Sequence, residues 1–163
     1  MVSVIIVTTN NLSGMDNCIR SLKNQSFKDF DTIVVVNNSQ YDIINNFRKG
    51  LPEATFIVNK GNLLFCRAYN QGIRQSKGEC VLCLNDDVVL EDNFIEELVK
   101  AVNIDKRIGM ASGKILRMDK ITIDSAGLFL GKSRKPMERG FNQKDNGQYN
   151  KEGYIFGCCG AAA

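Results

Sequence analysis

Three residues whose side chains carry carboxylate or amide oxygens, Asn85, Asp86 and Asp87, lie in the stretch LNDDVV between two apolar runs. Two adjacent carboxylates repel each other unless a positive charge lies beside them. Mg²⁺ and Mn²⁺ prefer oxygen ligands, and proteins typically hold them with one or two carboxylates and the phosphates of a bound molecule. The stretch therefore predicts a weakly held divalent metal that neutralises a diphosphate.

A turn or a helix cap is the ordinary explanation for Asn, Ser and Asp after a strand. Here residues 88–90 separate the two carboxylates from the helix expected at 91–105, and Asp92 is better placed to cap that helix. The spacing therefore favours a metal site over a cap.

An alternation of strands and helices must position these residues. Nearly continuous apolar runs predict buried strands at 2–9, 32–36, 55–58 and 80–84. Apolar residues at helical spacing predict helices at 15–25, 41–49, 65–76 and 91–105. This order is typical of an α/β fold with a mostly parallel central sheet and helices on both faces, as in Rossmann-like proteins.

Polar clusters follow three of the four strands. They are Thr8-Thr9-Asn10, Asn37-Asn38-Ser39 and Asn85-Asp86-Asp87. In open α/β sheets, ligands bind outside the carboxyl ends of the strands, at the crevice where the strand order reverses. Polar groups that converge on one edge are what a bound polar ligand requires, so the three clusters together predict a ligand cleft.

The chain after residue 105 has a different pattern. Segments 108–118 and 121–130 predict strands with Gly and Ser interruptions, and the polar, glycine-containing segment 131–150 predicts a mobile loop. The final segment, YIFGCCGAAA, resembles the start of a further element. We therefore expect that the sequence is truncated at its C-terminus.

Charge and hydropathy give no support to several function classes. The 21 basic and 18 acidic residues leave a formal charge of +3 without any basic run, which gives no reason to expect nucleic acid as a partner. No apolar stretch approaches the roughly 18 residues that span a bilayer, and no basic segment precedes VSVIIV. We therefore expect a cytoplasmic protein without a transmembrane segment, and peripheral membrane association remains open.

The sequence lacks the complete motifs of several other kinds of site. The six cysteines lie mostly in apolar or helical contexts, which favours buried free thiols. Zinc is disfavoured because Cys80 and Cys83 form a single CxxC in a chain without histidine. The first strand is not followed by G-x-G-x-x-G, and GLFLGKS at 127–133 has three residues between its glycines where a P-loop has four. A dinucleotide site and a P-loop are therefore disfavoured.

The ordered motifs resemble those of family 2 glycosyltransferases with the GT-A fold, most closely the bacterial rhamnosyltransferase-like members. VSVIIVTTN resembles their opening strand, DTIVVVNNS the second strand, NLLFCRAYNQGI the Asn-x-Gly-Phe segment and LNDDV the DXD-type motif. The resemblance implies that Asp87 ligates Mg²⁺ or Mn²⁺, with Asp86 as a second candidate. It implies a donor-nucleotide site formed by Thr8, Thr9, Asn10, Asn37, Asn38, Asn62, Asn70, Asn85 and Asp86.

The sequence departs from the family pattern at several positions. Asn37 occupies the position where the family usually has an Asp that contacts the base, and Leu64 stands where Gly is usual. Gly160 and Ala161 match the family's Gly-Ala pair on the acceptor side. The family's catalytic base, an Asp or Glu, follows that pair, so the resemblance places it beyond Ala163 and identifies no catalytic residue here.

The resemblance implies one GT-A glycosyltransferase domain over 1–163, with a donor-binding part at about 1–117 and an incomplete acceptor-side part at 118–163. It implies that a sugar is transferred with inversion from a nucleotide-diphospho-sugar to a glycan or lipid-linked acceptor, in cell-surface polysaccharide or glycan synthesis. Two alternatives remain. One is a non-catalytic nucleotide-sugar-binding module or inactive fragment. The other is a nucleotidyltransferase, which TTNNLSG at 8–14 disfavours because it lacks a basic residue.

Overall fold

The computed structural model describes residues 1–9, 14–38 and 41–163. The chain forms two compact units. The first comprises Met1–Glu97 together with Ala162, and the second comprises Leu98–Ala161 together with Ala163. The boundary therefore falls within the helix α4 (Phe94–Asn103). The sequence-based division into a donor-binding part and an acceptor-side part near residue 117 stays a prediction.

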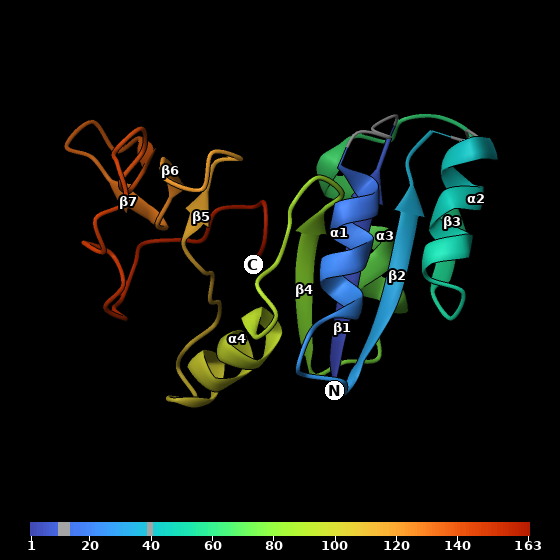
Figure 1. The fold of residues 1–163 in the computed structure, drawn as a ribbon, viewed down its shortest axis with the longest axis horizontal. Coiled ribbons are helices and arrows are strands. Elements are labelled where there is room, and N and C mark those ends of the chain that lie inside the picture. The colour runs from blue at the N-terminus through green and yellow to red at the C-terminus, as the bar shows by residue number, and fades with distance from the viewer. Residues whose placement is uncertain (10–13, 39–40) are drawn as a thin grey trace. The chain divides into compact units, whose positions relative to one another are not determined.

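A parallel sheet of four strands forms the centre of the first unit (Figure 1). Its strands are β1 (Val2–Thr8), β2 (Phe30–Val36), β3 (Thr55–Val58) and β4 (Cys80–Asn85). They lie in the order β3-β2-β1-β4, and each pairs in parallel with its neighbour. The chain thus moves outward from β1 to β3 and then returns to the other side of β1. The strand order reverses between β1 and β4, which is where ligands bind in such sheets.

Helices cover both faces of this sheet, as the sequence predicts. They are α1 (Met15–Lys23), α2 (Tyr41–Gly50) and α3 (Phe65–Gln75). In Figure 1, α1 lies in front of the sheet and α3 lies behind it. α1 contacts α2, whereas α3 contacts β1 and β2. The connections between parallel strands are right-handed. Those through α1 and α2 run from β1 toward β3, whereas the connection through α3 runs back to β4. The helix α3 therefore lies on the opposite face of the sheet.

The core of the first unit is built on β1, whose side chains are buried on both faces. Val4, Ile5 and Ile6 have no exposed surface. Ile5 packs in a cluster that includes Ala68 of α3. A methyl group added at Gly72 would lie 2.5 Å from Cγ2 of Ile5, so the absence of a side chain there lets α3 approach the sheet closely. This close packing fixes α3 against β1 next to the predicted cleft.

The second unit contains two short antiparallel pairs. β5 (Ile115–Leu116) pairs with β6 (Ile123–Ser125), and β7 (Leu128–Leu130) pairs with β8 (Pro136–Glu138). The predicted strand at 121–130 is therefore divided into two, because Gly127 adopts a φ of +93° between them. The segment 131–150, which the sequence predicts as a mobile loop, contains the strand β8, so that prediction is wrong at 136–138.

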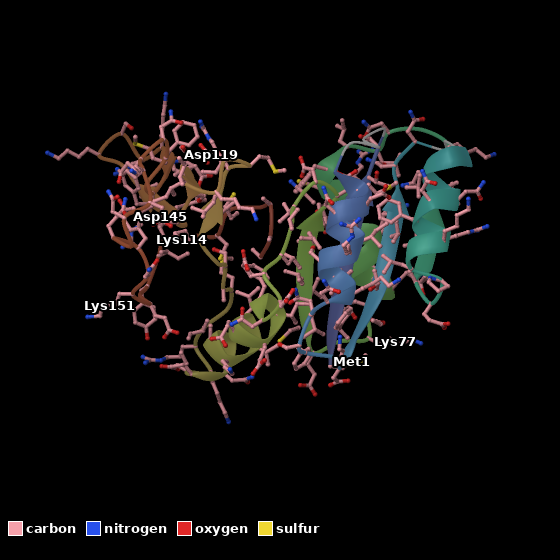
Figure 2. All side chains as sticks on the ribbon, viewed as in Figure 1. Met1, Lys77, Lys114, Asp119, Asp145 and Lys151 are labelled. Atoms are coloured by element: carbon pink, nitrogen blue, oxygen red, sulfur yellow. The ribbon has the colours of Figure 1, made fainter. Side chains whose placement is uncertain are left out.

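A half-buried ion pair also connects segment 131–150 to Lys114 within the second unit. Nζ of Lys114 lies 2.5 Å from Oδ2 of Asp145 (Figure 2), and the two side chains are 21% and 16% exposed. Lys114 also donates to Oδ1 of Asn150 at 2.6 Å. In the described part of the chain, none of the helices has the length and apolar character that a membrane crossing requires.

Candidate functional site

A cleft of about 300 Å³ lies at the carboxyl ends of β1, β2 and β4. Strand register explains why the polar residues meet there: Thr8 is level with Val36, and Val7 is level with Asn85. The residues that follow these strands therefore emerge at one height of the sheet. The cleft is lined by Val7, Thr9, Asn37, Asn62, Leu64, Phe65, Asn85, Asp86 and Asp87.

One end of the cleft is acidic. Asp86 is half-buried and Asp87 is exposed. Burial raises the pKa of Asp86 above its usual range; the Thr8 hydroxyl acts in the opposite direction, and the charge of Asp87 raises that pKa further. Among the ion pairs between described residues, none includes Asp86 or Asp87. None of the described Lys and Arg side chains therefore pairs with these two carboxylates, which favours a bound cation.

The donor atoms at this end fit a hard divalent cation. The Thr8 hydroxyl is buried and lies near Asp86, but among the described residues it has no hydrogen-bond partner of good geometry. In the described part of the chain, no group of three or more His, Cys, Asp and Glu side chains could hold a metal by itself. Such a site would hold Mg²⁺ or Mn²⁺ through Asp87 and Asp86 only with further oxygens from a ligand such as a diphosphate. The donor set does not fit a structural zinc site.

Asn85 is held in place from two helices. The Tyr69 hydroxyl on α3 donates to its Oδ1 at 3.3 Å, and the Cys18 thiol on α1 donates to its backbone oxygen at 3.6 Å. Burial raises the pKa of Cys18 to about 12 and raises that of Tyr69 as well. Both groups therefore remain protonated donors at neutral pH. Cys18 thus holds the backbone of Asn85, and Tyr69 holds its side chain, beside the acidic pair.

Gly14, immediately before α1, approaches the acidic pair closely. Gly14 has a φ of +121°, which side chains rarely allow, and a methyl group there would lie 3.4 Å from Cα of Asp87. The start of α1 therefore lies against Asp87. The partial positive charge of a helix N-terminus favours anionic groups in its vicinity.

The other end of the cleft contains amide and apolar side chains. Asn37 is 1% exposed, donates to Oδ1 of Asn62 at 2.8 Å and accepts from the Leu63 N–H at 2.9 Å. Leu64 and Phe65 are exposed at this end, and the Phe65 ring lies 4.5 Å from that of Tyr69. The cleft thus has a charged end after β4 and an uncharged end, lined by amide and apolar side chains, after β2.

The structure brings together most, but not all, of the residues that the sequence predicts for the site. Thr9, Asn37, Asn62, Asn85, Asp86 and Asp87 line the cleft, and Thr8 lies buried near Asp86. Asn38 is half-buried after β2, whereas Asn70 is exposed on α3 and is not among the lining residues. Asn10 lies outside the described residues. Gly160 is exposed and Ala161 half-buried in the second unit, so their acceptor-side role stays a prediction.

Sequence reasoning missed three residues that shape the site. Cys18 and Tyr69 look like ordinary apolar-face positions of helices, and their donor role depends on where Asn85 lies. Gly14 follows the predicted opening cluster, but its approach to Asp87 joins positions far apart in the chain. Of these three residues, only Tyr69 could have been found from the sequence. It follows Phe65 at the helical spacing that places two aromatic rings on one face.

Known proteins with similar sequences are glycosyltransferases. The family model described as glycosyl transferase family 2 matches residues 3–161. GalNAc(5)-diNAcBac-PP-undecaprenol beta-1,3-glucosyltransferase of Campylobacter jejuni is 31% identical over 111 residues, which are 62% of this chain and 34% of that protein. The uncharacterized glycosyltransferase YwdF of Bacillus subtilis is 24% identical over 103 residues, which are 62% of this chain and 38% of that protein. The chain thus spans little more than a third of these relatives.

Solved structures of GT-A glycosyltransferases share this fold. The mannosyltransferase PcManGT from Pyrobaculum calidifontis, in complex with GDP-Man and Mn²⁺, has a TM-score of 0.58 at 18% identity, over 66% of this chain and 33% of that one. S. aureus TarS 1-349 in complex with UDP-GlcNAc has a TM-score of 0.55 at 22% identity, over 63% of this chain and 31% of that one. The α/β fold with a mostly parallel sheet is therefore the GT-A fold. Because the family model matches nearly the whole sequence, the chain belongs to glycosyl transferase family 2.

Proposed function

We propose that this chain is the donor-binding part of an inverting glycosyltransferase, which binds a nucleotide-diphospho-sugar and a divalent metal in the cleft between β1 and β4. The observation that carries the proposal is the acidic pair Asp86 and Asp87, which makes no ion pair with the described residues and lies at the point where the strand order reverses. The complexes of similar folds with GDP-Man and Mn²⁺, and with UDP-GlcNAc, support it.

Each residue at the acidic end has a proposed role. Asp87 ligates Mg²⁺ or Mn²⁺, and Asp86 is the second ligand. Asn85, held by Tyr69, hydrogen-bonds the ribose or the diphosphate. A bound divalent metal would neutralise the charge of the departing nucleoside diphosphate. The amino-terminal end of α1, next to Asp87, adds a favourable potential for the same phosphates.

The acceptor part of the proposal is a glycan or a lipid-linked glycan in cell-surface polysaccharide synthesis, with a cytoplasmic location. The name of the Campylobacter jejuni relative, which includes a lipid-linked saccharide, supports this class of acceptor. Transfer also requires a base that removes the proton of the acceptor hydroxyl as it attacks the anomeric carbon. We assign no residue of 1–163 to that step.

Calorimetric titration with UDP-, GDP- and dTDP-sugars, in excess Mn²⁺ and in a chelator, tests donor binding. We expect at least one of the three classes to bind in Mn²⁺, and its affinity to fall roughly 10-fold or more in the chelator. Absence of binding by all three classes in Mn²⁺ would refute the proposal.

A non-catalytic nucleotide-sugar-binding module is the second candidate. The observation that favours it is that Asp86 and Asp87 are the only acids among the described residues that line the cleft. If the metal holds both, neither is left to act as a base. Release of the nucleoside diphosphate by the 163-residue chain, in the presence of donor and Mn²⁺, would exclude this second candidate.

A further inference from the structure

Leu64 has an unusual backbone conformation for a residue with a side chain. Its φ is 66° and its ψ is 166°, a region that is almost restricted to glycine. Its side chain is 71% exposed and lines the cleft. Burial in the core therefore does not compensate for the strain. Strain of this kind persists only where surrounding contacts impose it, and it is concentrated at binding sites.

Hydrogen bonds hold Leu64 on both sides of its α-carbon. Its N–H donates to Oδ1 of Asn62 at 2.8 Å. Its carbonyl oxygen accepts from the N–H of Ala68 at 3.2 Å, the first turn of α3, and from Nδ2 of Asn37 at 3.5 Å. The side chain of Asn62 and the start of α3 thus impose the conformation together.

A network of four amide side chains in turn fixes Asn62. Nδ2 of Asn37 donates to Oδ1 of Asn62 at 2.8 Å, and Oδ1 of Asn37 accepts from Nδ2 of Asn59 at 3.3 Å. Asn59 and Gln71 exchange two hydrogen bonds, at 2.7 and 3.0 Å. Asn37 and Asn59 are almost completely buried. We call Asn37, Asn59, Asn62 and Gln71 the amide network.

Backbone donors fix the orientation of the two amides that matter most. The N–H of Leu63 can only donate, so it requires the oxygen of Asn37, and the N–H of Leu64 requires the oxygen of Asn62. A donor is then needed between the side chains of Asn37 and Asn62, and only the NH₂ group of Asn37 supplies it. A carboxylate at position 37 would place two acceptors against each other. Rotation of the Asn62 amide would leave the Leu64 N–H facing another donor.

The amide network therefore occupies the hydrogen-bonding atoms of Asn37 within the protein. Nδ2 has partners in Asn62 and Leu64, and Oδ1 has partners in Leu63 and Asn59. A residue that is 1% exposed and bonded on both sides acts on a ligand through its neighbours. The residues that it positions are Leu64 and, through the start of α3, Phe65.

The polarity of the cleft indicates what Leu64 and Phe65 contact. The acidic pair follows β4, whereas Asn37 follows β2, and β1 lies between these strands. Two strand spacings, about 10 Å, therefore separate the two ends. With metal and diphosphate at the acidic end, the nucleoside extends toward the uncharged end. There the exposed Leu64 and the half-exposed ring of Phe65 offer apolar surface that suits a planar base.

On the basis of the proposed function, we propose that the amide network holds Leu64 in its strained conformation so that Leu64 and Phe65 form the wall that contacts the nucleobase. Asn37 is then a positioning residue of the base site rather than a base contact.

The first experiment uses Leu64→Gly, with UDP, GDP and dTDP as probes and inorganic pyrophosphate as the probe without a base, all in excess Mn²⁺. Glycine relieves the backbone strain and removes the apolar contact. We expect a melting temperature no lower than that of the wild type. The nucleotide with the highest wild-type affinity should bind roughly 10-fold more weakly, and pyrophosphate should bind as before.

The same titrations separate two kinds of failure. If the wild type binds neither the nucleotides nor pyrophosphate, the proposed function fails. If the wild type binds and Leu64→Gly leaves nucleotide affinity unchanged, or weakens nucleotide and pyrophosphate equally, the role of the Leu64 wall is overturned while the proposed function stands.

The second experiment compares Asn37→Asp with the wild type at about pH 5 and about pH 8. A protonated carboxyl can donate to Oδ1 of Asn62 as the amide does, whereas the ionised form is buried and faces an acceptor. The folded-state pKa of the introduced carboxyl is therefore raised above its value in the unfolded chain. The variant's stability is then full at low pH and declines as the pH rises through the folded-state pKa.

We expect the nucleotide affinity of Asn37→Asp, relative to wild type, to be close to unity at about pH 5 and to fall roughly 10-fold or more at about pH 8. Asn46→Asp, which introduces the same charge on the exposed side of α2, should equal the wild type at both pH values. An Asn37→Asp affinity that is unchanged at about pH 8, or reduced equally at both, would refute the positioning role.

Discussion

Asp87→Asn removes the metal-dependent part of nucleotide binding, and we expect the affinity in excess Mn²⁺ to fall roughly 100-fold. The substitution preserves the shape of the side chain and removes a charge from a pair that makes no ion pair with the described residues. The same variant should bind with nearly equal affinity in Mn²⁺ and in a chelator. Calorimetry with the nucleotide that binds the wild type measures both values.

Asp92→Asn is the matched control for this prediction. It removes the same charge from an exposed residue in the loop before α4, and Asp92 is not among the residues that line the cleft. The control should retain the wild-type affinity and its dependence on Mn²⁺. Wild-type affinity in Asp87→Asn would remove Asp87 from the site, and an equal loss in both variants would indicate a general effect of charge.

Gly78→Ala should destabilise the first unit more than other glycine substitutions. A methyl group at this position would lie 2.5 Å from the backbone nitrogen of Ser3 on β1 and 2.7 Å from the backbone oxygen of Cys80 on β4. Both atoms belong to the sheet, so a strand must move. The cost should be about 3 kcal/mol, which lowers the melting temperature by roughly 6–12 °C. Thermal denaturation followed by circular dichroism measures this change.

Gly61→Ala supplies the comparison, because a methyl group there meets no atom within 4 Å. Its melting temperature should stay within about 2 °C of the wild type. Equal shifts for the two variants would show that close packing at Gly78 does not determine the effect. A large shift for Gly78→Ala alone would confirm that this turn fixes the approach of β4 to β1.

The fold of the first unit could be predicted from the sequence because its strands are buried on both faces. Runs such as VSVIIVTT contain too few polar residues for an edge strand or a surface helix, and the helices between them require parallel pairing. Parallel strands align their carboxyl ends, so the clusters after β1, β2 and β4 had to meet. The cleft and its acidic end follow from that geometry alone.

The uncharged end of the cleft, after β2, could not be predicted from the sequence in the same way. The environment of Asn37 depends on the path of residues 59–64, and no hydrophobic periodicity specifies that path. The sequence interpretation of Asn37 as a base contact stays a prediction beside our proposal that it positions Leu64. Leu64 itself was visible only as a departure from the usual glycine, without any sign that its backbone keeps a glycine conformation.

The second unit was predicted least well for a related reason. Its strands are short, and its contacts join residues far apart in the sequence, such as Lys114 and Asp145. Periodicity over two or three residues cannot be distinguished from chance. The turn at Gly127, which separates β6 from β7, depends on a positive φ that the sequence permits but does not require.

Paramagnetic line broadening by Mn²⁺ in the amide NMR spectrum tests the central claim that metal and nucleotide bind together between β1 and β4. With nucleotide present, substoichiometric Mn²⁺ should selectively broaden the amide signals of Thr9, Gly14, Asp86 and Asp87. Signals near Glu53, at the far side of the sheet beyond β2, should stay sharp. Broadening that is centred on another acidic segment, such as Asp119 of the second unit, or that is uniform over the chain, would contradict the account.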